Sequence, residues 1–152
     1  MTAKMQPSSP STAVERVTEL SNADLHDLYD AAAAAIADGG GFGWLATPDR
    51  DDMIQFWKGV LLVPERDLLV ARLDGVIAGS AQLQRAARNN EAQASIGQLN
   101  TFFVAPWARG HGLAPKLVEG VEELAKAYGL KVLTLDVRAT QVRAIEIYER
   151  SG

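Results

Sequence analysis

The chain has 152 residues, of which 47% are hydrophobic and 22% charged, with a net charge of -4 and no cysteine. This length and balance suit one soluble globular domain, and the net acidity argues against general binding to nucleic acid or to anionic membranes. The absence of cysteine excludes disulfides, thiolate metal sites and cysteine nucleophiles. With His26 and His111 as the only histidines, we predict no metal site.

The first residues do not predict a targeting segment. Residues 1–11 are polar, with two prolines among serines, and lack the apolar core of a signal peptide. No apolar run approaches the ~20 residues that a membrane span needs. We therefore expect a cytoplasmic protein with a flexible tail over residues 1–11, one domain over residues 12–152 and no membrane partner.

The first helix is preceded by a short strand pattern over residues 13–20. Ser21 and Asn22 are candidate N-caps for a helix whose apolar residues, from Leu25 to Ile36, recur at helical spacing. The glycines after Asp38 predict its end.

A second helix and a hairpin follow. Residues 42–52 are loop-like, and residues 51–60 predict a helix. The dipeptide Asp74-Gly75 separates two apolar runs, residues 68–73 and 76–84, and predicts a tight hairpin turn between two strands.

The second half predicts a strand–helix–strand unit. Residues 96–104 form a strand pattern, and the helix from Leu113 to Tyr128 has one apolar side. Residues 131–137 form the next strand pattern, so the two strands should be parallel. A last helix is expected over residues 140–150. The fold class is thus α/β, of the α+β type, with a mixed, mostly antiparallel central sheet flanked by helices.

The stretch from Arg109 to Ala114 lies between the predicted strand 96–104 and the long helix. A glycine-rich turn at that position presents backbone N–H groups and the positive end of a helix dipole, which together suit a phosphate. Pro106 would end the strand, and Arg109 adds a fixed cation. The alternative is a turn whose glycines only shorten the connection.

These motifs resemble those of the GNAT superfamily of acetyl-CoA-dependent N-acetyltransferases. Arg109-x-x-Gly112-x-Ala114 is similar to the family signature (Gln/Arg)-x-x-Gly-x-(Gly/Ala), and Phe102-Phe103-Val104-Ala105-Pro106 resembles the strand before it. Residues 143–152 resemble the late helix of the family, and the similarity covers residues 98–152. The resemblance implies a GNAT-like fold and acetyl transfer to a primary amine of a small molecule or peptide.

The resemblance also implies how acetyl-CoA binds. The amides of residues 110–114 would bind the pyrophosphate, and the pantetheine arm would lie along residues 102–104 like an added strand. A backbone N–H near Val104 would face the thioester carbonyl. Pro115 lacks one N–H donor, and His111 is either a phosphate neighbour or an ordinary surface histidine. The cofactor-binding residues implied are Phe102, Phe103, Val104, Arg109, Gly110, His111, Gly112, Leu113, Ala114 and Gln141.

Tyr148 is the catalytic residue that the resemblance implies, because the family has a tyrosine of the late helix near the CoA sulfur. Gln141 and Tyr148 would share one side of that helix. The alternative is a core aromatic residue with its hydroxyl at the surface.

The general base is left open. Many relatives have a glutamate on the strand before the glycine turn, where this chain offers Gln98, Asn100 and Thr101. A water held by Gln98 or Asn100 could relay the proton, or an aspartate of the group Asp49, Asp51 and Asp52 could do so. The favoured role of that acidic group is helix N-capping.

The acceptor amine is not identified by the sequence. Phe42, Trp44, Phe56 and Trp57 either shape an apolar acceptor pocket or, for Phe56 and Trp57, belong to the core.

Two other functions compete with acetyl transfer. One is a non-catalytic acyl-CoA-binding regulatory module, and the other is a nucleotide-binding protein, although the P-loop ending Gly-Lys-(Ser/Thr) is missing.

The end of the chain carries one more expectation. Family members usually continue with two more strands, so strand 131–137 would expose an unpaired apolar edge. We expect that edge to be covered by further residues or by a partner chain, which includes a homodimer.

Overall fold

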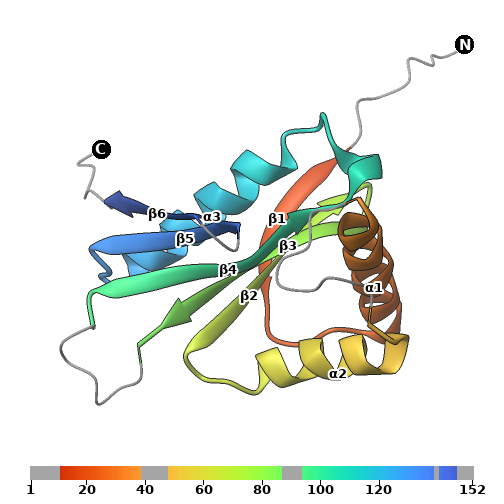
Figure 1. The fold of residues 1–152 in the computed structure, drawn as a ribbon, viewed down its shortest axis with the longest axis horizontal. Helices are drawn as coiled ribbons and strands as arrows, with labels where there is room; N and C mark the ends of the chain where they lie inside the picture. Colours follow the sequence, from red (N-terminus) through yellow and green to blue (C-terminus); the bar gives the residue numbers. More distant parts are fainter. Residues whose placement is uncertain (1–10, 39–47, 87–93, 139–140, 147–152) are drawn as a thin grey trace, which may run out of the picture.

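A computed structural model describes residues 11–38, 48–86, 94–138 and 141–146 of the chain. Within these residues, six strands form one sheet in the order β1-β2-β3-β4-β5-β6, and only β4 and β5 are parallel. Figure 1 shows the sheet with its helices. The elements are β1 (Thr12–Val17), α1 (Asn22–Ala37), α2 (Arg50–Leu61), β2 (Arg66–Leu73), β3 (Val76–Arg85), β4 (Ile96–Val104), the 3-10 turn η2 (Pro106–Ala108), α3 (Leu113–Ala127), β5 (Val132–Arg138) and β6 (Gln141–Glu146).

The predicted elements of the first half are confirmed. The Ser21 side chain accepts a hydrogen bond from the Asp24 N–H at 3.0 Å and so caps α1, which ends at Asp38. The hairpin turn between β2 and β3 places Asp74 and Gly75 at φ of 52° and 84°, the left-handed conformation that a two-residue turn of this kind requires. The mixed, mostly antiparallel sheet is confirmed as well.

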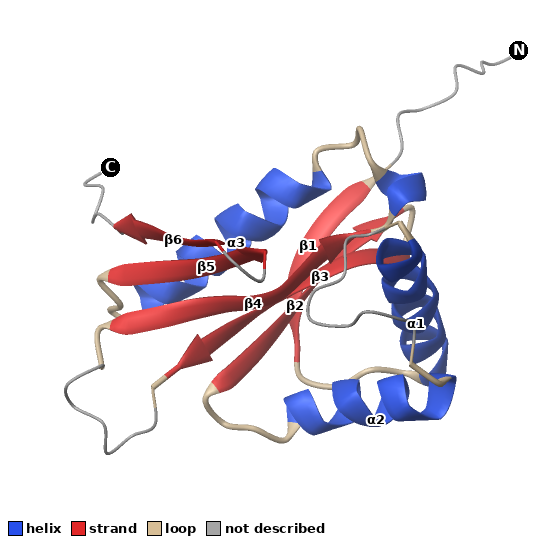
Figure 2. Cartoon of the chain, in the orientation of Figure 1, coloured by secondary structure: helices blue, strands red, loops and turns tan. Residues whose placement is uncertain are grey.

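The helices cover both faces of the sheet (Figure 2). In α3, a Cβ added to Gly120 would lie 3.0 Å from Leu69 and 3.1 Å from Val14, so α3 packs closely on the face to which these two side chains point. On the opposite face, the Trp57 ring of α2 lies 6.2 Å from the Phe103 ring of β4. Helix α1 contacts α2, β3 and β4 and completes this second layer, which we call the α1–α2 face.

The predicted last helix over residues 140–150 is wrong for its described part. Residues 141–146 form β6, which pairs antiparallel with β5 from Arg138↔Gln141 to Val132↔Glu146. The spacing that suggested a helix is weak here, because Val142 and Ile145 are β-branched and favour strands. The backbone of β5 also offers a free edge whose polar groups gain partners when β6 pairs with it.

The same pairing corrects a second expectation. Strand β5 does not expose an unpaired edge, because this chain's own β6 covers it. The edge of β5 therefore needs no partner chain to cover it.

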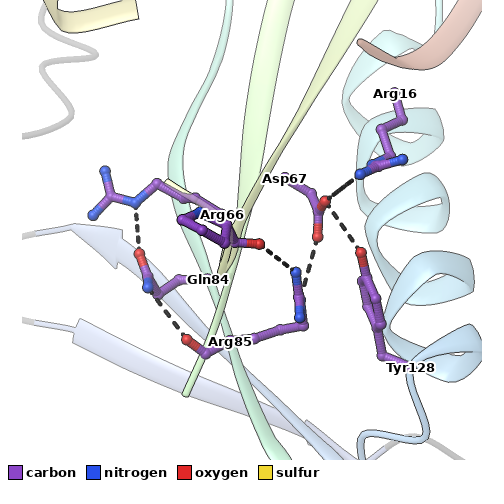
Figure 3. Close-up of polar contacts among 7 residues, drawn as sticks. Arg16, Arg66, Asp67, Gln84, Arg85 and Tyr128 are labelled. Atoms are coloured by element: carbon purple, nitrogen blue, oxygen red, sulfur yellow. Dashed lines mark hydrogen bonds and ion pairs between the residues drawn. The ribbon is translucent and has the colours of Figure 1, made fainter. Parts of the chain in front are cut away.

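A buried carboxylate fastens one end of the sheet to α3. Asp67 of β2, whose side chain is 2% exposed, lies 2.9 Å from Arg16 of β1 and 3.4 Å from Arg85 of β3. The Tyr128 hydroxyl, at the end of α3, donates to the same carboxylate at 3.2 Å (Figure 3). The Arg85 guanidinium also lies 3.9 Å from the centre of the Tyr128 ring, which favours a cation–π contact. Burial and the bond to Asp67 raise the pKa of Tyr128.

Candidate functional site

Strands β4 and β5 separate halfway along β4. The two strands pair only from Ile96↔Val132 to Leu99↔Leu135, whereas β4 remains paired with β3 as far as Val104. Among the strands that the structure describes, β4 therefore has a neighbour on one side only from residue 100 to residue 104 (Figure 1). An edge of this kind presents backbone N–H and C=O groups that an extended ligand can pair with.

A β-bulge lies where the strands separate. Ser80 pairs with Phe103 and Gln82 with Asn100, so Thr101 and Phe102 together face Ala81. Thr101 has φ of 50°, in the left-handed region that a β-branched residue rarely adopts. A bulge bends its strand and increases the local twist, which accounts for the departure of β4 from β5. The sequence carries no glycine or asparagine at position 101 that could have predicted it.

The backbone N–H of Val104 faces the gap between the two strands. The N–H of Ala105 donates to the Ala78 carbonyl at 2.8 Å, on the β3 side. Because successive N–H groups in a strand point to opposite edges, the Val104 N–H points toward the side that β5 has left. This agrees with the place that the sequence analysis expected for a donor to a carbonyl oxygen.

The glycine turn joins β4 to α3. Gly110 and Gly112 have φ of 86° and 74°, which glycine adopts without strain. Gly112 is the N-cap of α3 and has no side-chain cap, and the first turn of α3 contains no acidic residue. The first N–H groups of a helix have no partner within the helix. This turn therefore offers uncapped N–H donors at the positive end of α3, as an anion requires.

A cavity of about 340 Å³ connects the turn with the strand. Its lining brings together β4, the turn and the first residues of α3, together with Ala35 of α1. The lining residues are Ala35, Phe102, Phe103, Val104, Ala108, Arg109, Gly110, Gly112, Leu113, Ala114 and Pro115. Eight of the ten residues predicted to bind cofactor therefore line one cavity.

The guanidinium of Arg109 forms an ion pair across the turn. It donates to the Asp38 carboxylate at 2.6 Å, and both side chains are about half exposed. Asp38 is the C-cap of α1, so the signature arginine links the turn to the end of the first helix. Asp38 could not be predicted from the sequence, because 71 residues separate the pair and neither residue has a pattern that points to the other.

The structure does not bring the remaining predicted residues to the cavity lining. His111 is exposed beside the turn and does not line the cavity. Gln141 begins β6 and pairs with Arg138, so it is not on a helix. Tyr148 lies outside the described residues, as do Phe42 and Trp44.

The candidates for the general base lie on β4 and at the start of α2. On β4, Gln98 is exposed, whereas Asn100 and Thr101 are half-buried. Asp49 is the N-cap residue of α2, without a side-chain cap bond, and Asp51 and Asp52 are in the first turn, as expected for acidic residues that stabilise a helix N-terminus.

Trp57 belongs to the core. Its side chain is fully buried and lies edge-on to Phe56, with ring centres 4.9 Å apart.

In the part of the chain that the structure describes, no group of three or more histidine and carboxylate residues could hold a metal ion. No helix there is long and apolar enough to cross a membrane.

Strand β4, whose residues 100–104 pair with β3 but not with β5, leads through the glycine turn into α3. This arrangement suits a long phosphorylated ligand. Residues 18–152 match the model of the acetyltransferase (GNAT) family. The chain belongs to this family, and it is an acyltransferase enzyme.

The relatives agree with this family. An uncharacterized N-acetyltransferase of the hisH-hisA intergenic region of Azospirillum brasilense is 64% identical over 130 residues, which are 86% of this chain and 77% of the relative. An IAA acetyltransferase of the same organism is 30% identical over 92 residues, 60% of this chain and 57% of that protein.

Solved structures share the fold. An N-acetyltransferase from Staphylococcus aureus Mu50 aligns with a TM-score of 0.65 and 18% identity, over 82% of this chain and 72% of that one. The yncA protein of Salmonella typhimurium, described as an acetyltransferase and solved with its cofactor acetyl-CoA, aligns with a TM-score of 0.61 and 19% identity, over 82% and 68%.

Proposed function

We propose that this enzyme transfers an acetyl group from acetyl-CoA to a primary amine of a small molecule or peptide by direct attack. The observation that carries the proposal is the gap beside residues 100–104 of β4, which continues into the glycine turn through one cavity. The acetyl-CoA bound to the Salmonella typhimurium relative supports it.

The residues present suit acetyl-CoA along its length. The N–H groups of the turn and of the first residues of α3 bind the pyrophosphate. The free edge of β4 pairs with the amides of the pantetheine arm, as an added strand would. Phe102, Val104 and Leu113 line the cavity with apolar surface for the hydrocarbon parts of that arm.

The protein's contribution to the chemistry is orientation and charge stabilisation. The amine nitrogen forms a bond to the thioester carbon, and the C–S bond breaks as the tetrahedral intermediate collapses. The Val104 N–H donates to the oxyanion of that intermediate, and Tyr148 gives a proton to the leaving thiolate. A water held by Gln98 or Asn100 accepts the proton that the amine loses.

Glycine substitutions test the binding site with a matched control. We expect Gly112→Ala to weaken acetyl-CoA binding, because a side chain strains the left-handed turn that aims the N–H donors. Gly129→Ala, near the other end of α3 at φ of 77°, carries a similar strain but lies away from the cavity. Calorimetric titration with acetyl-CoA should therefore separate the two variants, and equal affinities would contradict the proposed site.

A second candidate function is a regulatory module that binds acyl-CoA without turnover. The absence of a carboxylate among Gln98, Asn100 and Thr101 favours it. Release of CoA measured with a panel of amines decides between them. Tight acetyl-CoA binding with no CoA release from any amine would support the regulatory module, and amine-dependent release would support the enzyme.

A further inference from the structure

The helices of the α1–α2 face cover only part of the sheet. Along β3, the side chains of Ser80 and Gln82 are fully buried, whereas Gln84, the next residue on the same face, is half-buried. Along β4, Phe103 is buried and its ring lies against α2, whereas Gln98 is exposed. These residues form cross-strand pairs, so both strands open to solvent in the same direction. The open part begins where β4 leaves β5.

Four polar residues form a row across this open part. Arg66 of β2 pairs with Gln84, Gln84 with Gln98 of β4, and Gln98 with Thr134 of β5. Paired residues on neighbouring strands share a face, so all four belong to the α1–α2 face. Each of them keeps some exposure. A ligand can therefore contact this row, which we call the polar row, from solvent.

The positive charge of the polar row has no carboxylate partner. The Arg66 guanidinium donates through Nε to Gln84 Oε1 at 2.5 Å and through Nη1 to Gln82 Oε1 at 3.5 Å. Both oxygens belong to neutral amides. Within the described part of the chain, Arg66 forms no ion pair, and its Nη2 donates to no other residue. The half-buried guanidinium is therefore fixed in place by amides while its charge stays uncompensated.

The nearest buried carboxylate lies on the other face of the sheet. Figure 3 shows Arg66 and Gln84 on one side of the strands and Asp67 on the side of α3, as expected for consecutive residues of a strand. The charge of Asp67 is shared by Arg16 and Arg85. Asp67 therefore does not neutralise Arg66.

A carboxylate is the ligand that suits this arrangement. The planar guanidinium matches the two oxygens of a carboxylate, and hydrogen bonds between charged groups are stronger than those between neutral ones. A phosphate monoester would bring close to two negative charges to a site with one cation. The polar row therefore favours a carboxylate over a phosphate.

The distance from Arg66 to the reacting amine selects among carboxylates. In the proposed function, the amine loses its proton to a water held by Gln98 or Asn100 of β4. Strands β2 and β4 are two strand spacings apart, ~10 Å, and the bond to Gln84 brings the guanidinium part of the way across. A separation of about 5–10 Å remains, whereas the amine and the carboxylate carbon of an α-amino acid are only ~2.5 Å apart. Roughly five methylene groups span the distance, at ~1.5 Å for each C–C bond.

We propose that Arg66 binds a carboxylate at the far end of the acceptor and so determines acceptor specificity. The acceptor class is an amino-carboxylate whose reacting amine is about five carbons away from its carboxylate, such as an ω-amino acid or a basic amino acid acetylated on its side chain. Gln84 is a positioning residue that holds the guanidinium. The inference rests on the proposed acetyl transfer and deepens it.

The test uses two acceptors that differ only in charge. The chain and the amine of 6-aminohexanoate recur in 6-aminohexanamide, which has a neutral carboxamide in place of the carboxylate. We expect Arg66→Met to lower kcat/KM for 6-aminohexanoate by about tenfold, because a charge-assisted contact is lost, and to leave 6-aminohexanamide unchanged. Arg66→Lys keeps the charge without the planar fork and should give an intermediate value for 6-aminohexanoate.

Gln84→Glu tests the charge without removing the arginine. The new carboxylate would lie where the amide oxygen now accepts from Arg66, so it should compete with the carboxylate of the acceptor. We expect this variant to lose the preference for 6-aminohexanoate as Arg66→Met does. If Arg66 had only a structural role, the stronger contact would leave the two acceptors in their wild-type ratio.

Arg50→Met is the matched control. Within the described residues, Arg50 also forms no ion pair, and it contacts His26 at 2.8 Å near the start of α2, whereas Arg66 follows the end of that helix. This variant should leave the ratio of the two acceptors unchanged. Acetyl-CoA affinity should be the same in all these proteins.

A series of chain lengths tests the distance. The loss caused by Arg66→Met should be largest for 6-aminohexanoate, smaller for 4-aminobutyrate and absent for β-alanine, whose carboxylate cannot reach the guanidinium while its amine is at β4. An equal loss for all three would contradict the proposed placement of the amine and the carboxylate.

A binding measurement keeps this inference separate from acetyl transfer. Saturation-transfer NMR with 6-aminohexanoate should show binding to the wild type and a weaker signal with Arg66→Met, whether or not any amine is acetylated. Equal losses for both acceptors, a wild-type preference in Gln84→Glu, or binding of 6-aminohexanoate that is unaffected by Arg66→Met would overturn the proposal. Binding that depends on Arg66, without acetylation of any amine, would support the carboxylate site and count against the proposed function alone.

Discussion

At the scale of single residues, the contact between Arg109 and Asp38 has the clearest functional meaning. The guanidinium that we propose lies beside the phosphate is already paired with a carboxylate. In the proposed binding mode, a pyrophosphate would therefore compete with Asp38 for the same donor, and it would also approach a like charge.

This competition predicts that Asp38→Asn binds acetyl-CoA more tightly. The gain should be at most about fivefold, because exposed ion pairs contribute only about 0.2–1 kcal/mol, and it should shrink at high salt. Titration at low and high ionic strength measures it. Asp30→Asn, on the same helix, removes one charge without touching Arg109. Weaker binding by Asp38→Asn would instead mean that Asp38 holds Arg109 in its binding position.

The strained backbone of Thr101 supports a second prediction at this scale. Thr101→Gly should stabilise the protein by about 1 kcal/mol, since relief of the left-handed strain exceeds the extra entropy of glycine in the unfolded chain. The corresponding rise in Tm is about 2–4 °C for a chain of this size. Thr134→Gly is the contrasting variant, because Thr134 is in regular strand β5 and its loss should destabilise. A Tm of Thr101→Gly below that of the wild type would show that the bulge needs the threonine side chain.

At the scale of elements, the Asp67 cluster joins β1, β2, β3 and the end of α3 through one carboxylate. The hairpin β2–β3 and two elements distant from it in sequence, β1 and α3, therefore depend on its charge. The sheet end that carries Gln84 and Arg85 is held in register by it, and Arg85 also donates to the Pro64 carbonyl at 2.7 Å.

Tyr128→Phe tests this cluster through pH. Near pH 7 the variant should lose about 0.5–1 kcal/mol, the usual contribution of one partly exposed hydrogen bond. The raised pKa of Tyr128 means that the folded state holds this proton more tightly than the unfolded chain. The wild-type advantage is therefore complete below the ordinary tyrosine pKa of about 10 and is lost as pH rises through the folded pKa. Urea unfolding at pH 7 and pH 11 measures it, and a constant difference would contradict the contact with Asp67.

Elements whose signals are local could be predicted from the sequence. The hairpin turn at Asp74-Gly75, the cap at Ser21 and the parallel pair around α3 all depend on residues close in the chain. Strand β6 could not, because its residues also fit a helical spacing, and pairing with the free edge of β5 decides between the two. The glycine turn that lines the cavity could be predicted, whereas the bulge of β4 and the contact to Asp38 depend on partners far away in sequence.

At the scale of the whole molecule, the gap where we propose that acetyl-CoA binds lies between two neighbouring strands of the sheet, β4 and β5. We expect acetyl-CoA to slow hydrogen exchange at the Val104 amide, which points into the gap, because the pantetheine arm would pair with it. The Ala105 amide already donates to Ala78 and should exchange slowly with or without acetyl-CoA. Amide exchange followed by NMR compares the two adjacent residues directly. No change at Val104 on saturation with acetyl-CoA would contradict the strand-like binding mode.

The separation of β4 and β5 also has a consequence for selectivity among ligands. Most proteins shield the outer strands of a sheet from other chains, but here, among the described strands, an edge without a strand partner lies between β4 and β5. Backbone pairing there does not depend on side-chain identity, so short extended peptides should compete with acetyl-CoA for the same amides. Unfolded segments in the cell would then act as weak inhibitors, and in the proposed binding mode the glycine turn, which such peptides cannot engage without a phosphate, would give acetyl-CoA its advantage.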